Sequence, residues 1–225
     1  MRAWRTVGLT MAASAVAQSF GRFTYAVLLP AIQQDLDITY TLAGTVGSAN
    51  LVAYLAGSIA ASYASTRLDP ITLIKIGTGL STMGLGLAWF APNLAWLLVA
   101  MIVTGFAGAV IWIPAPGIAG ASVIPARRGL AVGLTQAGIG IGVVTAGVLA
   151  TVIRSSQGDA GWRTLYGIEA VIGSMAFLGA VWWLRISTVQ SKDPVHLASV
   201  KLVPGWPQLL GGYMSFGISY ALFTI

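Results

Sequence analysis

The stretch LAWLLVAMIVTGFAGAVIWIPAPGIA, residues 94–119, contains no charged residue. An α-helix rises about 1.5 Å per residue, so a stretch of this length crosses the roughly 30 Å of hydrocarbon in a bilayer. Comparable apolar stretches occupy residues 7–29, 42–65, 71–91, 130–153 and 165–184, and a seventh begins near Leu209. We therefore predict an all-α integral membrane protein, a six-helix bundle followed by the start of a further span.

The composition supports this fold class, because 56% of residues are hydrophobic, 8% are charged and the mean hydropathy is +0.83. Nine of the 12 Lys and Arg residues lie before the first span or after the second, fourth and sixth spans, namely Arg2, Arg5, Arg67, Lys75, Arg127, Arg128, Arg185, Lys192 and Lys201. Basic loops stay cytoplasmic, so we expect a cytoplasmic N-terminus. The net charge of +6 reflects this topology and does not indicate nucleic-acid binding. With no cysteine, disulfides and thiolate metal sites are excluded.

The beginning of the chain has a rival interpretation. Arg2 and Arg5 precede a short apolar run that ends in Ala15-Val16-Ala17, which resembles a signal-peptidase site. The apolar run continues to Leu29, however, and is then long enough to span the bilayer. A membrane span is therefore favoured over a cleaved signal.

The first span carries a polar stripe. Ser14, Gln18, Arg22 and Tyr25 are spaced four, four and three residues apart, which places them on one helix face. Arg22 is about 10 Å from the outer end, where an unpaired guanidinium costs several kcal/mol. It either binds an anion or relays charge, or it is a structural residue that pins two helices or snorkels outward.

Two other spans carry softer polar stripes. Asn50, Tyr54 and Ser58 lie on the second span, and Gly133, Gln136 and Gly140 lie on the fifth. Three stripes together indicate a shared, water-accessible cavity. In the fourth span Pro114 and Pro116 each remove a helical hydrogen bond, which predicts a kink. The kink is either a hinge beside an aromatic wall formed by Trp112, or a bend that only lets Trp112 pack.

Glu169 lies about five residues inside the outer end of the sixth span. It is a candidate for proton coupling, or an ion-pair partner of Arg22, or an interfacial residue that reaches outward past Trp162. Small residues spaced by four predict close helix packing, at Gly77 and Ser81, Gly79 and Met83-Gly84, Gly129 and Gly133, and Gly138 and Gly142.

Several motifs resemble the N-terminal half of a major facilitator superfamily transporter. They are G-R-F-x-Y-x-x-L-L-P (residues 21–30), P-x-R-R-G (125–129) and G-W-R (161–163). The motif F-G-x-S-Y (216–220) resembles the YbfB/YjiJ-type branch. The resemblance implies two six-helix halves, each of two inverted three-helix repeats, with the first and fourth spans lining a central path and substrate bound near the midplane.

The chain also departs from the family pattern. Ser65 stands where the loop signature after the second span has an Asp, and Met101 stands where many members carry an Arg used in proton coupling. The fifth span lacks the Gly-Pro of the antiporter signature, which favours symport or facilitated transport. The chain also has only six complete predicted spans where a full member has twelve.

We therefore predict secondary-active transport of a small anionic solute by alternating access, without enzymatic activity, metal or cofactor. Arg22 is expected to meet the anion, with Gln18, Tyr25, Asn50, Tyr54 and Gln136 as hydrogen-bonding groups, Trp112 packing on the solute, Glu169 coupling a proton, and Pro114 and Pro116 as a hinge. The alternative is a six-span accessory protein that binds a membrane partner and transports nothing. A membrane enzyme is a weak third reading, because no span has ligand or triad spacing.

The expected organisation is a six-span half (residues 1–185), a cytoplasmic loop (186–205) and a truncated seventh span (206–225) in a bacterial inner membrane. The end of the chain within an apolar run favours truncation. Residues 1–225 alone are not expected to transport, because the path of this fold forms between two halves. The expected partners are therefore lipid and a C-terminal half or a second subunit.

The predicted topology is testable by cysteine labelling, because the chain has no native cysteine. Asn93→Cys should react with an impermeant maleimide added outside, and Ser191→Cys should react only after permeabilisation. Labelling of Ser191→Cys but not of Asn93→Cys would show that the topology is inverted.

Overall fold

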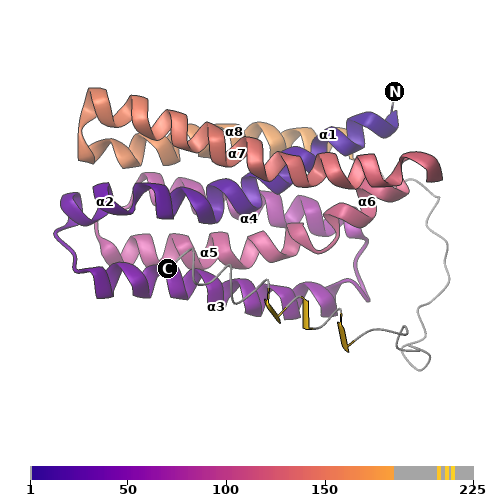
Figure 1. Cartoon of the computed structure of the whole chain (residues 1–225), viewed down its shortest axis with the longest axis horizontal. Helices are drawn as coiled ribbons and strands as arrows, with labels where there is room; N and C mark the ends of the chain where they lie inside the picture. Colours follow the sequence, from indigo (N-terminus) through magenta and orange to yellow (C-terminus); the bar gives the residue numbers. More distant parts are fainter. Residues whose placement is uncertain (1, 185–206, 209–210, 213, 216–225) are drawn as a thin grey trace. The chain divides into compact units, whose positions relative to one another are not determined.

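The computed structural model describes residues 2–184, 207–208, 211–212 and 214–215, and the regular elements of residues 2–184 are all helices (Figure 1). The chain divides into two compact units, Met1–Ser187 and Thr188–Ile225. The helices below belong to the first unit. Most of the predicted loop 186–205 and of the seventh span lies outside the described residues, as do Arg185, Lys192 and Lys201.

The first predicted span lies in one helical segment with three parts. They are α1 (Arg2–Ser14), the π-helix η1 (Ala15–Phe23) and α2 (Thr24–Leu36). The backbone N–H of Thr24 donates to the carbonyl of Ser19, five residues back. The α-helical spacing expected for residues 15–23 is therefore wrong. Because π-helical turns are rare and concentrate at functional sites, the position of Gln18 and Arg22 within η1 is informative.

The next three helices begin at side-chain caps. They are α3 (Tyr40–Ala64), α4 (Pro70–Trp89) and α5 (Leu94–Trp112). Thr39 accepts a hydrogen bond from the Leu42 amide at 3.3 Å, Asp69 from Thr72 at 3.2 Å, and Asn93 from Trp96 at 3.0 Å. Each cap satisfies a backbone donor that the helix itself leaves unpaired.

The fourth predicted span is interrupted at its prolines. Helix α5 ends at Trp112, and α6 (Ala115–Ala121) continues after Ile113 and Pro114. Pro114 and Pro116 have no N–H to donate to the carbonyls of Val110 and Trp112, so the helical ladder breaks there. The predicted kink is confirmed, and its role as a hinge stays a prediction.

A 3-10 turn, η2 (Pro125–Arg127), leads into α7 (Arg128–Gln157), and η3 (Asp159–Gly161) leads into α8 (Trp162–Trp183). Five described helical stretches are long and apolar enough to cross a membrane: Tyr40–Ala64, Pro70–Trp89, Leu94–Ala121, Pro125–Gln157 and Asp159–Trp183. They match the second to sixth predicted spans. The predicted all-helical, multi-pass membrane fold is confirmed.

Glycines set how closely these helices approach. Helix α5 packs against α3 and α4, α4 packs against α8, and α7 packs against α1 and η1 (Figure 1). A Cβ atom on Gly105 would lie 2.3 Å from the backbone oxygen of Asn50, and one on Gly138 would lie 2.4 Å from that of Met11. Gly129 and Gly133 are instead exposed, with no atom within 4 Å of such a Cβ, so the packing predicted for that pair is wrong within the described residues.

Two glycines of α7 provide a matched test of this packing. Gly138→Ala should lower the free energy of unfolding by about 1–3 kcal/mol, because the new methyl group overlaps the Met11 backbone. Thermal unfolding of the purified protein in detergent measures the effect.

Gly140→Ala, two residues further along the same helix, is the control. Its methyl group meets no atom within 4 Å, so the loss of backbone flexibility should leave stability equal or slightly higher. Equal destabilisation by both variants would contradict the close contact of α1 with α7.

Candidate functional site

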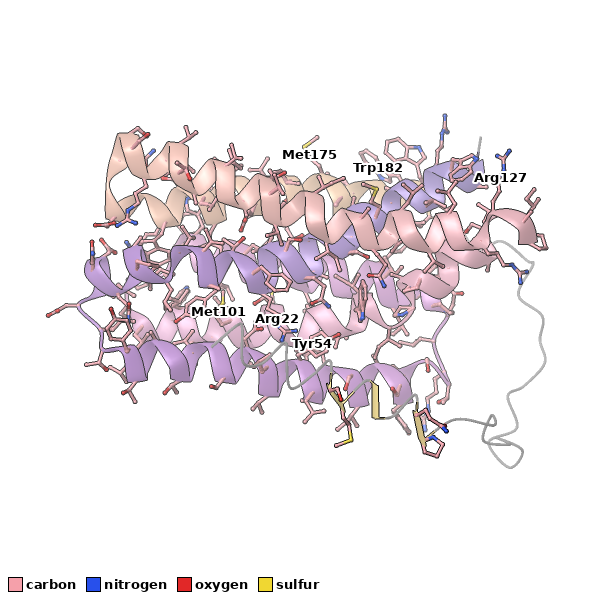
Figure 2. The ribbon with its side chains drawn as sticks, in the orientation of Figure 1. Arg22, Tyr54, Met101, Arg127, Met175 and Trp182 are labelled. Atoms are coloured by element: carbon pink, nitrogen blue, oxygen red, sulfur yellow. The ribbon has the colours of Figure 1, made fainter. Side chains whose placement is uncertain are left out.

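Three side chains of the predicted polar stripes meet in the middle of the bundle. The Gln18 Nε2 atom donates to the Tyr54 hydroxyl at 3.4 Å, and Cζ of Arg22 lies 5.6 Å from the centre of the Tyr54 ring. Figure 2 shows Arg22 and Tyr54 beside each other between the first helical segment and α3. A guanidinium at this distance from an aromatic ring makes a cation–π interaction. Arg22 and Tyr54 are half-buried, and Gln18 is buried.

Helix α5 packs against this group of side chains at Gly108. A Cβ atom on Gly108 would lie 3.2 Å from the backbone oxygen of Ala17, so the small residue lets η1 approach α5 closely, and the Tyr54 ring, 3.6 Å from the same position, lies against this part of α5. Trp112 follows Gly108 by four residues and therefore shares its face of α5. Trp112 is half-buried and lies one helical turn further along this face of α5, next to the break at Pro114.

Tyr25 and Asn50 are engaged in contacts between helices. The Tyr25 hydroxyl donates to the backbone oxygen of Ala43 at 2.8 Å. The Asn50 amide nitrogen lies 2.8 Å from the Met101 carbonyl, and 3.2 Å from both the Gly21 carbonyl and the Thr104 hydroxyl. Met101, at the position where the family pattern places an Arg, thus binds Asn50 through its backbone and is fully buried.

Gln136 lies apart from this cluster. Helix α7 buries Ala131, Thr135 and Gly138 and exposes Gly133, Gln136 and Gly140. The predicted stripe therefore forms an exposed face of α7. No described contact joins Gln136 to Arg22 or Tyr54.

Glu169 is fully buried, and its Oε1 atom accepts a hydrogen bond from the Thr24 hydroxyl at 2.5 Å. An outward-reaching interfacial position is therefore wrong. The Glu169 Oε2 atom has no hydrogen-bond partner among the described residues, so the ion pair with Arg22 is not formed. No three His, Cys, Asp or Glu side chains in the described part of the chain are grouped to hold a metal ion.

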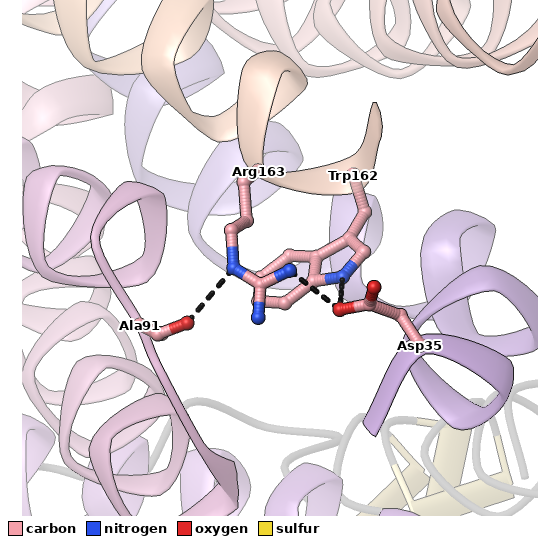
Figure 3. Close-up of polar contacts among 4 residues, drawn as sticks. All are labelled: Asp35, Ala91, Trp162 and Arg163. Atoms are coloured by element: carbon pink, nitrogen blue, oxygen red, sulfur yellow. Dashed lines mark hydrogen bonds and ion pairs between the residues drawn. The ribbon is translucent and has the colours of Figure 1, made fainter. Parts of the chain in front are cut away.

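A polar cluster at the end of the bundle that the sequence predicts to be outer, here named the outer cluster, was not predicted as a unit. Asp35 Oδ2 accepts hydrogen bonds from Trp162 Nε1, at 3.0 Å, and from the Arg163 guanidinium (Figure 3). Arg163 Nε also donates to the backbone oxygen of Ala91 at 2.9 Å, and its Cζ lies 4.2 Å from the Trp162 ring centre. The cluster connects α2, the loop between α4 and α5, and the start of α8. The motif Gly161-Trp162-Arg163 was the sequence signal, but its partner Asp35 was not recognisable.

The charge of Asp35 depends on this cluster. Partial burial raises the pKa of its carboxyl group, but hydrogen bonds from Trp162 and Arg163 and the Arg163 charge outweigh burial and hold the pKa below its usual value. Asp35 lies beyond the predicted first span, which ends at Leu29. The hydrogen bonds from Trp162 and Arg163 therefore stabilise the ionised form of the Asp35 carboxyl group.

Comparisons with known proteins agree with this architecture. Residues 11–225 match the family model of the Major Facilitator Superfamily. Among solved structures, the crystal structure of a D-xylose-proton symporter is similar, with a TM-score of 0.62 and 17% sequence identity over 97% of this chain and 52% of that chain. The chain thus spans about half the length of that protein, and at this identity the likeness concerns the fold alone.

The outer cluster predicts a specific response of stability to acid. Because the folded-state pKa of Asp35 is lowered, its contribution is fully present above the unfolded pKa of about 4 and is lost as pH falls through the folded pKa. Asp35→Asn should lower the melting temperature at neutral pH and reduce its fall on acidification. Thermal unfolding between pH 7 and the lowest pH at which the protein stays soluble checks this.

Arg163→Gln is the partner variant, because it removes the cation and keeps a hydrogen-bonding side chain. In the Arg163→Gln background, Asp35→Asn should change the fall of the melting temperature on acidification much less than in the wild type. An equal change in both backgrounds would show that the pair is not responsible.

Proposed function

Because the chain belongs to the major facilitator superfamily, we propose that it forms one half of a secondary transporter for a small organic anion. Transport proceeds by alternating access, in which two halves rock about a site near the bilayer midplane. The coverage of about half of the similar symporter supports a missing second half as the partner. The YbfB/YjiJ-type motif, the bacterial inner membrane and the cytoplasmic N-terminus belong to the same proposal.

The proposal that the substrate is an anion depends on the surroundings of Arg22. Arg22 lies in the predicted first span and is half-buried, and its guanidinium lies over the ring of Tyr54, whose hydroxyl accepts a hydrogen bond from Gln18. A cation inside the hydrocarbon region is costly and marks a substrate or ion path by default. The planar guanidinium suits a carboxylate or phosphate, which it binds with two parallel hydrogen bonds.

The neighbours of Arg22 define the rest of the proposed site. The Tyr54 ring contacts the guanidinium, Gln18 donates a hydrogen bond to the Tyr54 hydroxyl, and Trp112 offers an aromatic surface one turn along α5. Tyr25 and Asn50 act by holding the first, second and fourth spans together, since their donors already bind backbone and hydroxyl oxygens. Gln136 enters the site only when the exposed face of α7 turns toward the solute.

The distribution of burial supports a second half. Of the five apolar helical stretches, Tyr40–Ala64 and Pro125–Gln157 are the least buried, with 28% and 22% of their most apolar windows inside the bundle. The exposed faces of α3 and α7 are largely apolar, with Val52, Leu55 and Ile59 on α3 and Val144, Val148 and Val152 on α7, and they also carry Ser48, Gly133, Gln136 and Gly140. The polar and small residues on these faces suit contact with a second half better than contact with lipid alone. The break at Pro114 and Pro116 gives the fourth span a place to bend during rocking.

Arg22→Leu should weaken binding of the anionic solute by about tenfold to a hundredfold, because a charge-assisted hydrogen-bonding group is lost. The measurement is a thermal-shift screen of the full-length protein against small carboxylates, phosphorylated compounds and D-xylose, followed by uptake of the best solute into proteoliposomes.

Arg154→Leu is the matched control, since it removes an exposed arginine at the end of α7 that pairs with Asp159. It should leave binding and uptake unchanged. A response of wild-type protein to D-xylose alone would exclude the anionic substrate, and equal binding by Arg22→Leu would exclude Arg22 from the site. Absence of uptake with any solute would favour the accessory-protein alternative.

A further inference from the structure

One carboxyl group of the described residues is fully buried, that of Glu169 on α8. Its Oε1 atom accepts a hydrogen bond from the hydroxyl of Thr24, a residue that is also fully buried. Its Oε2 atom has no hydrogen-bond partner among the described residues. Oε1 is therefore the carboxyl oxygen that faces a hydrogen-bonding group.

Thr24 has a second acceptor for the same proton. Its Oγ1 atom lies 3.3 Å from the carbonyl oxygen of Ser19 and 2.5 Å from Glu169 Oε1. A hydroxyl group has one hydrogen and therefore donates fully to only one of them. An ionised Glu169 is an acceptor only, so it takes the Thr24 hydrogen. A proton on Oε2 would have no acceptor, so a protonated Glu169 carries it on Oε1 and donates it to Thr24, and the Thr24 hydrogen is then free for Ser19.

The Ser19 carbonyl is the acceptor that closes the π-helical turn. It receives the backbone N–H of Thr24, which an α-helix would direct to Phe20. A second hydrogen bond from the Thr24 hydroxyl reinforces this acceptor. Loss of the second bond weakens the turn relative to the α-helical register.

We propose that Glu169 is a proton-binding site and that Thr24 is the positioning residue through which its protonation controls the π-helical segment η1. Protonation adds one proton from water to the carboxylate, reverses the hydrogen bond with Thr24 and directs the Thr24 hydroxyl to Ser19. Deprotonation returns the proton to water and releases η1 toward the α-helical register. No covalent bond other than that of the transferred proton changes.

The switch reaches the proposed solute site, and in this respect the inference rests on the proposed function. Gln18 and Arg22 both lie in η1, and both contact Tyr54. Removal of one residue from a turn rotates the following residues by about 100°, the angle per residue of an α-helix. The register of η1 therefore sets whether Gln18 and Arg22 can face Tyr54 together.

Other groups around Glu169 are uncharged or distant. The titratable neighbours are Tyr166 on α8, whose buried hydroxyl has no hydrogen-bond partner among the described residues, and Tyr25 on α2, which donates to Ala43. From α4 the buried Thr82 hydroxyl lies close to α8 at Gly173. The charged residues of α8 and of the elements packed on it are Arg2 and Arg5 of α1, Arg22 of η1, Asp35 of α2, Lys75 of α4, Arg128 and Arg154 of α7, Asp159 of η3 and Arg163 of α8 itself, and the hydrogen-bond partner of Glu169 is Thr24.

Hydrogen–deuterium exchange on the full-length protein in lipid nanodiscs tests the switch without any solute. The protection of the amides at residues 19–24, corrected for intrinsic exchange rates, should fall by about tenfold in one titration step as pH rises, the effect of one lost hydrogen bond. Glu169→Gln should hold the high, low-pH protection at every pH, because its amide donates to Thr24. Thr24→Val should give low protection at every pH, and Thr24→Ser should titrate like the wild type.

Thr78→Val is the matched control, since Thr78 is also a buried threonine but bonds the carbonyl of Ile74 in its own helix, at 2.7 Å. It should titrate like the wild type. Titration that persists in Thr24→Val, or that Glu169→Gln leaves unchanged, would overturn the switch. A protein that binds no anion but titrates as described would refute the proposed substrate and retain the switch. If uptake depends on Arg22 but the protection of residues 19–24 does not change with pH, the switch is refuted and the proposed function is retained.

Discussion

The bundle depends on how the amide nitrogen of one buried side chain is bonded. The Asn50 side chain on α3 donates toward Gly21 of η1 and toward Met101 and Thr104 of α5. An unbonded amide in hydrocarbon would cost several kcal/mol, so the three spans must keep this arrangement. Gly105 makes it possible, because any side chain there would collide with the Asn50 backbone. Tyr54, one turn further along α3, is positioned by the same contact.

Much of the fold could be predicted from the sequence, because the length of each apolar stretch and the charges that flank it are properties of the local sequence. The spans, the caps at Asp69 and Asn93 and the break at Pro114 depend on neighbouring residues, and these were predictable or agree with simple rules. The π-helical segment was not predicted, because Thr24 contacts a carboxyl on α8, far away in the chain. The link of Asp35 to Arg163 was missed for the same reason, since 128 residues separate them.

The candidate site was only partly predictable. Polar spacing selected Gln18, Arg22 and Tyr54, which the structure brings together, and their role in binding a solute stays a prediction. It also selected Tyr25 and Asn50, whose donors bind oxygens of neighbouring helices. A polar residue in a span faces either a cavity or another helix's backbone, and sequence spacing cannot distinguish the two because both occupy an inward face.

Two parts of the first helical segment are held in different ways. At the outer cluster, Asp35 accepts from two donors on α8, and Arg163 also binds Ala91, so several bonds must break together before α2 moves. In η1, the turn depends on one carbonyl whose hydroxyl donor has an alternative acceptor. Movement in packed proteins concentrates where two arrangements have similar energies. A change in the first span is therefore absorbed most easily at η1, the segment that carries Gln18 and Arg22.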